Sequence, residues 1–206
     1  MRIKRFALGQ MVANCYVVFD EETRIGVIID PGEFSQLVCN YVLKNGINIK
    51  YILLTHGHFD HVCGAADFAG RYKADIVIGS KESTMLDRLN SDFGSFEDID
   101  KITETVTVND GDTLKAGGLD IKCIATPGHT AGGMCYCING FVFSGDTLFC
   151  ASVGRSDFYS GDFDELKKSI RHLYALFPDD TVVYPGHGFS TTVGSEKHGN
   201  PYVKEK

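Results

Sequence analysis

The stretch Thr55-His56-Gly57-His58-Phe59-Asp60-His61 brings three imidazoles and one aspartate together directly after a nearly all-apolar run. Polar groups concentrated beside a buried strand are unfavourable unless a cation gathers them. In an extended segment His56 and His58 point to the same side, whereas Asp60 and His61 lie where the chain turns into a helix and can face a second point nearby. The stretch therefore predicts two adjacent metal positions. The alternative is a solvated, histidine-rich loop.

Three further polar residues share one local context, the end of a predicted strand beside glycine. They are His129 in PGH, Asp146 in SGD and His187 in PGH. Glycine lets the backbone bring a short ligand close to an ion. One such element would be weak evidence, because a lone histidine is more often an ordinary surface or core residue. Three of them on a chain that also carries HxHxDH predict one shared site.

Predicted strands and helices alternate around these motifs, as is typical of an α/β protein. Hairpin-forming strands open the chain, and a second group of strands, after residue 103, predicts a second sheet. Apolar residues at helical spacing mark the helices. The predicted strands cover residues 3–8, 15–20, 25–30, 49–56, 74–79, 103–108, 119–126, 133–138, 141–145 and 181–186. The predicted helices cover residues 34–46, 60–72, 81–90 and 163–176, with a loop at 91–100.

Length and composition favour one folded domain over residues 1–206. Domains have roughly 100–200 residues, and 43% of this chain is hydrophobic, with no linker or internal repeat. The charges sum to 20 − 27 = −7, which argues against nucleic acid and anionic membranes as partners. No apolar run approaches the ~20 residues of a membrane span, and the longest run near the start is too short for a signal peptide. We therefore expect a soluble, cytoplasmic protein.

Seven cysteines, an odd number, are scattered through this chain. A domain of this size needs no disulfides, so we expect reduced thiols that mostly pack in the core. Cys135 and Cys137 lie two apart in a strand, which favours burial over a redox or zinc pair. Cys63 and Cys150 lie near predicted ligands and are also expected to be packing residues.

These motifs resemble the metallo-β-lactamase superfamily of metallohydrolases, and within it the compact glyoxalase-II-like hydrolases. The resemblance covers nearly the whole chain, and HxHxDH followed by the three later ligands is specific for the fold and the metal site. It implies an αββα sandwich of two mixed β-sheets flanked by helices, with the site at one sheet edge. The matching segments are residues 14–16, 30–32, 55–61, 126–133, 144–149, 153–157, 184–188 and 200–201.

The resemblance also implies a ligand set for two divalent metal ions. One metal would take His56, His58 and His129, the other would take Asp60, His61 and His187, and Asp146 would bridge them. Imidazoles and carboxylates suit zinc, the favoured metal, with iron or manganese as alternatives. The β-lactamases proper commonly use cysteine or serine where this chain has Asp146, which disfavours antibiotic cleavage.

Four other residues are candidates for orienting the ligands or the substrate. Asp30 is a turn residue or, as the resemblance favours, accepts hydrogen bonds from the ligand loop. Thr55 and Ser144 either act similarly through their hydroxyls or make local turn hydrogen bonds. Arg155 either forms a surface pair with Asp157 or orients the substrate or the loop that carries Asp146.

The expected chemistry is hydrolysis of a small-molecule substrate. Two cations about 3.5–4 Å apart would share a water and lower its pKa towards ~7, which makes it a nucleophile. Asp60 is the predicted catalytic residue, which orients this nucleophile and moves its proton. The motifs contain no separate serine, cysteine or lysine nucleophile, and this favours a thiolate leaving group. A thioester such as S-lactoylglutathione is the leading substrate.

Other activities remain as alternatives. A lactonase or other carboxylic-ester hydrolase has the same fold, and so does a persulfide dioxygenase that uses one Fe(II), O₂ and glutathione persulfide. Phosphodiester cleavage is disfavoured by the net charge. A structural metal module is disfavoured because structural zinc sites are closed and cysteine-rich. The pattern makes no prediction of the oligomeric state or of the acyl and thiol groups.

Overall fold

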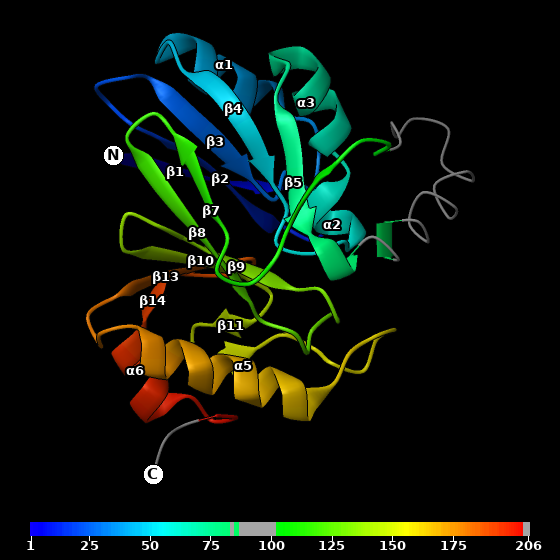
Figure 1. Cartoon of the computed structure of the whole chain (residues 1–206), viewed down its shortest axis with the longest axis vertical. Helices are drawn as coiled ribbons and strands as arrows, with labels where there is room; N and C mark the ends of the chain where they lie inside the picture. Colours follow the sequence, from blue (N-terminus) through cyan, green and yellow to red (C-terminus); the bar gives the residue numbers. More distant parts are fainter. Residues whose placement is uncertain (83–84, 87–101, 204–206) are drawn as a thin grey trace.

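Two six-stranded β-sheets lie face to face in the computed structural model, which describes residues 1–82, 85–86 and 102–203 (Figure 1). Helices cover the outer face of each sheet, so the layers follow one another as helix, sheet, sheet and helix. The expected αββα sandwich of two mixed sheets is confirmed. The predicted metal ligands lie together at one edge of the sandwich, where strands of both sheets end.

The first sheet holds its six strands in chain order. Its strands are β1 (Arg2–Leu8), β2 (Ala13–Phe19), β3 (Ile25–Ile29), β4 (Asn48–Leu53), β5 (Asp75–Gly79) and β6 (Val106–Val108). The first three are antiparallel, and β3 to β6 are parallel. The helices α1 (Gln36–Lys44) and α3 (Ala65–Tyr72) pack on the outer face. Because β3 and β4 end at the same edge, Asp30 and His56 emerge close together.

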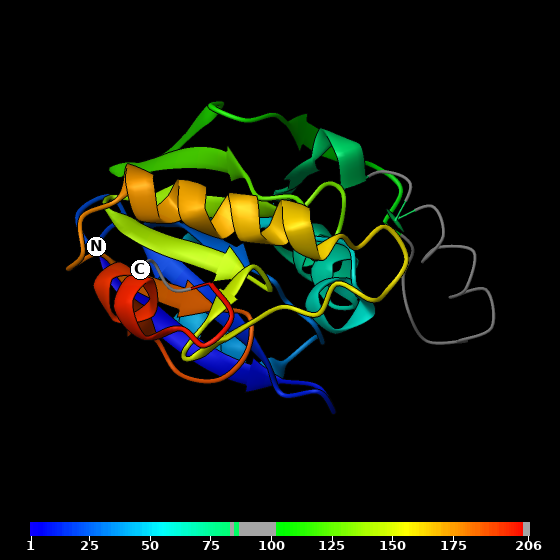
Figure 2. The ribbon, with the colours of Figure 1, turned by 90° about the horizontal axis from the view of Figure 1, so that it is seen from below.

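The second sheet is formed by later strands. They are β7 (Thr113–Ala116), β8 (Leu119–Ala125), β9 (Met134–Ile138), β10 (Phe141–Gly145), β13 (Val182–Pro185) and β14 (Thr191–Thr192). The spatial order is β14-β13-β10-β9-β8-β7, and only the β10–β13 pair is parallel. Figure 2 shows α5 (Phe163–Leu176) lying along this sheet, beside α6 (Val193–Gly199). A small hairpin, β11 (Leu148–Phe149) and β12 (Ser152–Val153), follows β10.

Strand residues alternate between two core layers, as the pleat requires. In β2, Cys15 and Val17 pack towards α1 and α3, whereas Tyr16 and Val18 pack between the two sheets. A third layer, which includes Leu166 of α5, lies under α5 and α6. The apolar layer between the two sheets thus holds them together. It thereby fixes the relative position of the strand ends that carry the site.

Some sequence predictions were wrong in detail. The single helix predicted over 60–72 is two helices, α2 (Phe59–Val62) and α3, because Gly64 packs against the backbone of Glu33 and leaves no room for a side chain. Not every apolar residue at helical spacing is buried, since Leu37 of α1 is 70% exposed. The strand predicted over 103–108 is confined to β6, and β7, β14 and α6 were not predicted. The helix predicted over 81–90 and the loop predicted over 91–100 lie largely outside the described residues. Within the described part, Ser80–Glu82 form a 3₁₀ turn.

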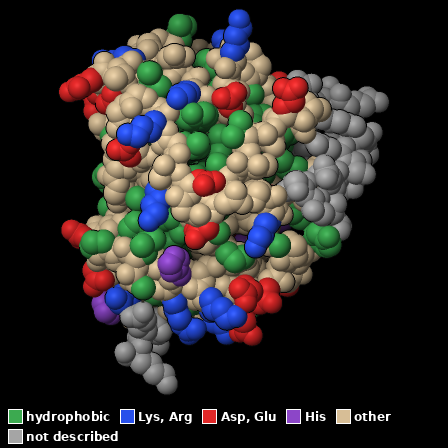
Figure 3. Space-filling view, viewed as in Figure 1, with side chains coloured by type: hydrophobic (Ala, Val, Ile, Leu, Met, Phe, Trp, Pro, Cys, Tyr) green, Lys and Arg blue, Asp and Glu red, His purple; other side chains and the backbone are tan. Residues whose placement is uncertain are grey.

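The cysteines are all unpaired, as expected. Cys135 is buried and Cys137 is half-buried, but Cys150 is exposed, so its assignment as a packing residue was wrong. Among the described residues, no helix has the length and apolar character needed to cross a bilayer. On the face drawn in Figure 3, acidic and basic side chains of the described part are interspersed rather than gathered by sign.

Candidate metal centre

All seven predicted ligands lie together where strands of both sheets end. His56 follows β4, His58 caps the start of α2, and α2 carries Asp60 and His61. The second sheet supplies the remaining three, each just after a strand: His129 after β8, Asp146 after β10 and His187 after β13.

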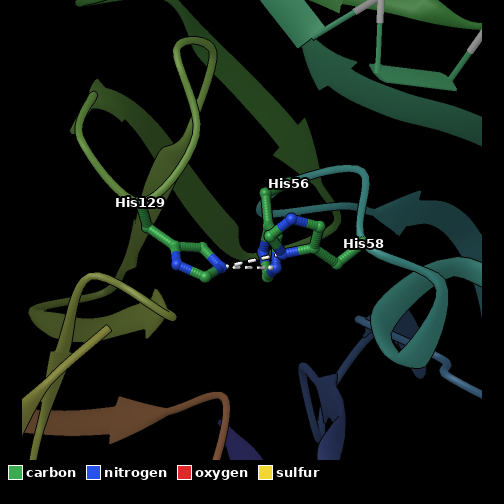
Figure 4. A group of neighbouring side chains, drawn as sticks. All are labelled: His56, His58 and His129. Atoms are coloured by element: carbon green, nitrogen blue, oxygen red, sulfur yellow. Dashed lines mark hydrogen bonds between the residues drawn. The ribbon is translucent and has the colours of Figure 1, made fainter. Parts of the chain in front are cut away.

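The first cluster consists of His56, His58 and His129, whose rings point towards one another (Figure 4). The Nε2 of His129 lies 2.9 Å from Nδ1 of His58 and 3.3 Å from Nε2 of His56. His56 and His129 are buried, and His58 is half-buried. Three ring nitrogens thus converge on one point from two loops far apart in the sequence.

The second cluster consists of Asp60, His61 and His187. The Nε2 of His187 lies 3.3 Å from Nε2 of His61 and 3.3 Å from Oδ2 of Asp60. The His61 ring is fully buried, whereas the other two side chains are partly exposed. This cluster therefore has one buried anchor and two groups within reach of solvent.

Asp146 lies between the two clusters. Its Oδ1 is 3.4 Å from Nε2 of His61, and its Oδ2 is 3.6 Å from Nε2 of His129 and 3.7 Å from Nε2 of His187. The buried Oδ1 has no hydrogen-bond partner in the described structure. A buried carboxylate oxygen without a donor is unfavourable, and a cation at this point would satisfy it.

The donor set and its spacing fit metal ions. Two imidazole nitrogens bound to a tetrahedral zinc at about 2.0–2.1 Å lie about 3.3–3.4 Å apart. The nitrogen pairs His56–His129 and His61–His187 are both 3.3 Å apart. Without an ion, each such pair would bring two lone pairs together unless one ring carried a proton.

Second contacts turn three of the five rings towards the centre. The Nδ1 of His129 lies 2.5 Å from the backbone oxygen of Arg155, and the Nδ1 of His56 lies 3.0 Å from Oγ1 of Thr55. The Nδ1 of His61 lies 3.1 Å from Oδ2 of Asp30. An N–H donated at Nδ1 leaves the lone pair of Nε2 for a metal, as in other histidine metal sites.

The electrostatics differ between the clusters. Burial lowers the pKa of His56 well below its usual value and lowers that of His58 and of His129 to about 4, so these rings are neutral at pH 7. Burial acts in the same direction on His61, but Asp146 and Asp30 outweigh it and raise its pKa to about 9. Burial raises the pKa of Asp146. The first cluster is thus ready to bind a cation, whereas His61 must first lose a proton.

Asp30 does more than form a turn. Its Oδ1 accepts a hydrogen bond from the backbone N–H of Thr55 at 2.8 Å, and its Oδ2 accepts one from the Thr55 hydroxyl at 2.7 Å. Together with the contact to His61, these bonds join the end of β4 to α2. Asp30 and Thr55 therefore shape the loop that carries HxHxDH.

The other two orienting candidates behave differently. The hydroxyl of Ser144 donates to the backbone oxygen of Leu148 at 2.8 Å, which is a local turn contact. The guanidinium of Arg155 pairs with both carboxylate oxygens of Asp157, at 3.0 and 2.8 Å, on the surface. It is the backbone of Arg155, and not its side chain, that contacts a predicted ligand.

Glu82 was missed by the sequence analysis. It is fully buried, and its Oε1 accepts a hydrogen bond from the backbone N–H of Gly57 at 3.0 Å. Its Oε2 accepts one from the hydroxyl of Thr130 at 3.1 Å, and the backbone N–H of Gly132 also donates to this carboxylate. Only its place just after a buried strand could have drawn attention to it. Glu82 links the loop that carries His56 and His58 to the loop that carries His129.

A cleft of about 710 Å³ opens over both clusters. Its floor includes the side chains of His58, Asp60, His129, Asp146 and His187, and apolar side chains from several loops form its walls. A substrate atom on this floor would therefore be close to both metal positions.

Comparison with known proteins agrees with this geometry. A family profile described as the metallo-beta-lactamase superfamily matches residues 8–187. The chain is 32% identical over its full length to the full length of a Haemophilus influenzae protein named hydroxyacylglutathione hydrolase GloC. It is also 33% identical to a Bacillus velezensis protein named probable polyketide biosynthesis zinc-dependent hydrolase BaeB, over 91% of this chain and 78% of that protein.

Solved structures are similar over almost the whole chain. The structure of BLEG-1 B3 metallo-beta-lactamase superposes with a TM-score of 0.88 at 29% identity and covers 99% of this chain and all of that one. TTHA1623 in a di-iron-bound form gives 0.85 at 30% identity, with 97% and 100% covered. ETHE1 from Myxococcus xanthus gives 0.82 at 30% identity, with 98% and 84% covered.

Proposed function

Because this chain belongs to the metallo-β-lactamase superfamily, we propose that it is a dinuclear metal-dependent hydrolase that acts on thioesters. The observation that carries the proposal is the position of Asp146 between two complete clusters of ligands. The relatives named hydroxyacylglutathione hydrolase and zinc-dependent hydrolase support the reaction class. Zinc is the proposed metal, and the di-iron form of a similar structure makes iron the alternative.

The proposed ligands divide as the two clusters do. His56, His58 and His129 would hold one ion, Asp60, His61 and His187 the other, and Asp146 would touch both. When bound, such ions lower the pKa of a coordinated water and polarise a carbonyl oxygen.

Asp60 is the proposed proton carrier. It is the acidic side chain of the second cluster that faces the cleft. Burial, the largest single effect, raises its pKa, but the hydrogen bond from His187 and the charges of His61 and His187 together outweigh burial and hold the pKa below the usual value. An ionised carboxylate at this point can orient a water through hydrogen bonds and accept its proton. The departing thiol needs little protonation, since its pKa is near 8.5.

The direct test is thioester hydrolysis by purified, metal-loaded protein, with S-lactoylglutathione as the first substrate. We expect turnover that a chelator abolishes, that added zinc restores and that His58→Ala reduces by at least about a hundredfold. His172→Ala is the matched control, because His172 is exposed on α5. Wild-type turnover no faster than that of His58→Ala on a panel of thioesters would reject the proposal.

The same preparation separates the alternatives. Two metal ions per chain and no oxygen uptake are expected of the hydrolase, and the completeness of the second cluster supports this outcome. One iron per chain with oxygen consumption on glutathione persulfide would instead establish the dioxygenase. Faster turnover of lactones than of any thioester would establish a lactonase.

A further inference from the structure

Large apolar side chains stand exposed around the mouth of the cleft. Met11 is 56% exposed, Phe59 51%, Phe158 47% and Tyr159 52%, and all four line the cleft. They come from segments far apart in the sequence, namely the β1–β2 turn, the start of α2 and the loop before α5. Apolar groups gathered at one concave site, rather than scattered singly, mark a binding surface.

This apolar wall reaches the metal clusters. The ring of Phe158 lies edge-on to His58 of the first cluster, with 5.7 Å between the ring centroids. The ring of Phe149 lies edge-on to His187 of the second cluster, at 6.1 Å. A substrate whose carbonyl lies over the clusters would therefore place its neighbouring groups against aromatic side chains.

In the described lining of the cleft, the one lysine or arginine that could meet an anionic substrate is already paired with an aspartate. Among its described lining residues, Arg155 is the only lysine or arginine. Its Nε and Nη2 atoms donate hydrogen bonds to the two carboxylate oxygens of Asp157. Its guanidinium carbon lies 4.2 Å from the centroid of the Phe158 ring. The carboxylates that face the cleft, Asp60 and Asp146, are proposed metal ligands and can donate no hydrogen bond to a substrate anion. A substrate carboxylate is strongly bound only where a charged or hydrogen-bonding partner is free to meet it.

We propose that the substrate is an uncharged thioester with an apolar chain, which lies along Phe158, Tyr159 and Met11. This inference rests on the proposed function and names its substrate class. It predicts that a small neutral thiol is a better leaving group for this enzyme than glutathione, whose thioesters carry a net negative charge. Water adds to the carbonyl carbon, the carbon–sulfur bond breaks, and the products are the carboxylic acid and the thiol.

Two series of substrates test this proposal. They show whether the apolar chain belongs to the acyl group or to the thiol of the thioester. In one, the thiol is N-acetylcysteamine and the acyl group grows from acetyl to butyryl, hexanoyl and octanoyl. In the other, the acyl group is acetyl and the thiol is a straight-chain alkanethiol of increasing length. We expect kcat/KM to rise in at least one series, by up to about fourfold per methylene group until the wall is covered.

The comparison of two thiols tests the preference for an uncharged substrate most directly. With the same acyl group, we expect the N-acetylcysteamine thioester to exceed the glutathione thioester in kcat/KM by about tenfold or more. A glutathione thioester that is equally good or better, or flat chain-length series, would overturn the proposal while leaving thioester hydrolysis intact. Absence of turnover on every thioester would reject the proposed function and this inference with it.

A variant links the preference to the wall. Phe158→Ala should reduce the octanoyl-to-acetyl ratio of kcat/KM by about tenfold and leave the metal content at the wild-type value. Tyr202→Ala is the matched control, because Tyr202 is similarly exposed but does not line the cleft. An unchanged ratio in Phe158→Ala would contradict the placement of the chain on this wall.

Discussion

The Oε1 atom of Glu82 lies 3.0 Å from the backbone nitrogen of Gly57 and accepts its hydrogen bond. Gly57 separates His56 from His58, and the other oxygen of Glu82 binds the hydroxyl of Thr130, next to His129. One buried carboxylate thus spaces the three rings of the first cluster. A side chain at Gly132 would collide with the backbone and Oε2 of Glu82, which explains the glycine there.

Replacing Glu82 should therefore weaken metal binding without touching a ligand. In Glu82→Ala three buried donors lose their acceptor, and at about 1–3 kcal/mol per unpaired group we expect the free energy of unfolding to fall by several kcal/mol. Glu82→Gln keeps the shape but presents an amide N–H to one loop, so we expect about tenfold weaker binding of the first metal. Denaturant-induced unfolding measures the free energy of unfolding, and calorimetric titration with zinc measures the metal affinity. Glu22→Gln, an exposed control, should bind normally, and equal affinity in Glu82→Gln would show that the spacing does not depend on this residue.

Asp30→Asn should act mainly on the other metal. The change can place an amide N–H where Oδ2 faces His61 and the Thr55 hydroxyl, whereas Oδ1 can still accept the hydrogen bond from the backbone N–H of Thr55 that holds the ligand loop. We expect the second metal to bind about 10–100-fold more weakly and the first within a fewfold of the wild type. Stepwise titration followed by metal analysis distinguishes the two sites, with the exposed Asp120→Asn as control. Equal weakening of both sites would show that Asp30 acts mainly through the loop that it shares with Thr55, and not mainly through His61.

Metal uptake should release protons from only one cluster. His58 and His129, with pKa values of about 4, are already neutral at pH 7, whereas His61, at about 9, is protonated and must lose its proton to bind a cation. The pKa of His187 is raised as well, because of its hydrogen bond with Asp60. Below pH 9 the second metal should therefore bind more weakly as the pH falls, by tenfold or more per unit, with at least one proton released at pH 7. Calorimetry in two buffers of different ionisation enthalpy measures this. Two titration steps without proton release would be inconsistent with a protonated His61.

The neighbours Gly154 and Arg155 should differ sharply on substitution. Arg155→Ala keeps the backbone oxygen that contacts His129, so we expect metal affinity within about twofold of the wild type. A side chain at Gly154 would collide with the backbone of Asp146 and press on Nδ1 of His129. Gly154→Ala should thus lose metal and thermal stability together. Strong metal loss in Arg155→Ala would instead assign a role to its guanidinium.

The sequence was sufficient to predict that the candidate ligands lie together, because HxHxDH and the glycine-flanked residues all follow apolar strands. Strand ends lie at sheet edges, so motifs distant in the chain could be expected to meet there. Asp30 was recognisable for the same reason, since it ends β3. Each of these predictions rests on a pattern of neighbouring residues within its own short segment.

Glu82 and the break between α2 and α3 carry no such local signal. A single glutamate in a polar segment looks exposed, and only the packing of the Thr130 loop over it makes it buried. Gly64 interrupts the helix because the backbone after β3 crosses it, which is a tertiary contact. The strand β7 and the helix α6 are short and poor in apolar periodicity, and their position depends on pairing with β8 and on the cap at Thr192.

Anomalous diffraction from crystals of the zinc-loaded protein would test the central claim most directly, because it locates each ion independently of activity. We predict two peaks about 3.5–4 Å apart, one beside His56, His58 and His129 and the other beside Asp60, His61 and His187, with a carboxylate oxygen of Asp146 bound to each. A single peak, or two ions of which neither contacts Asp146, would contradict the account.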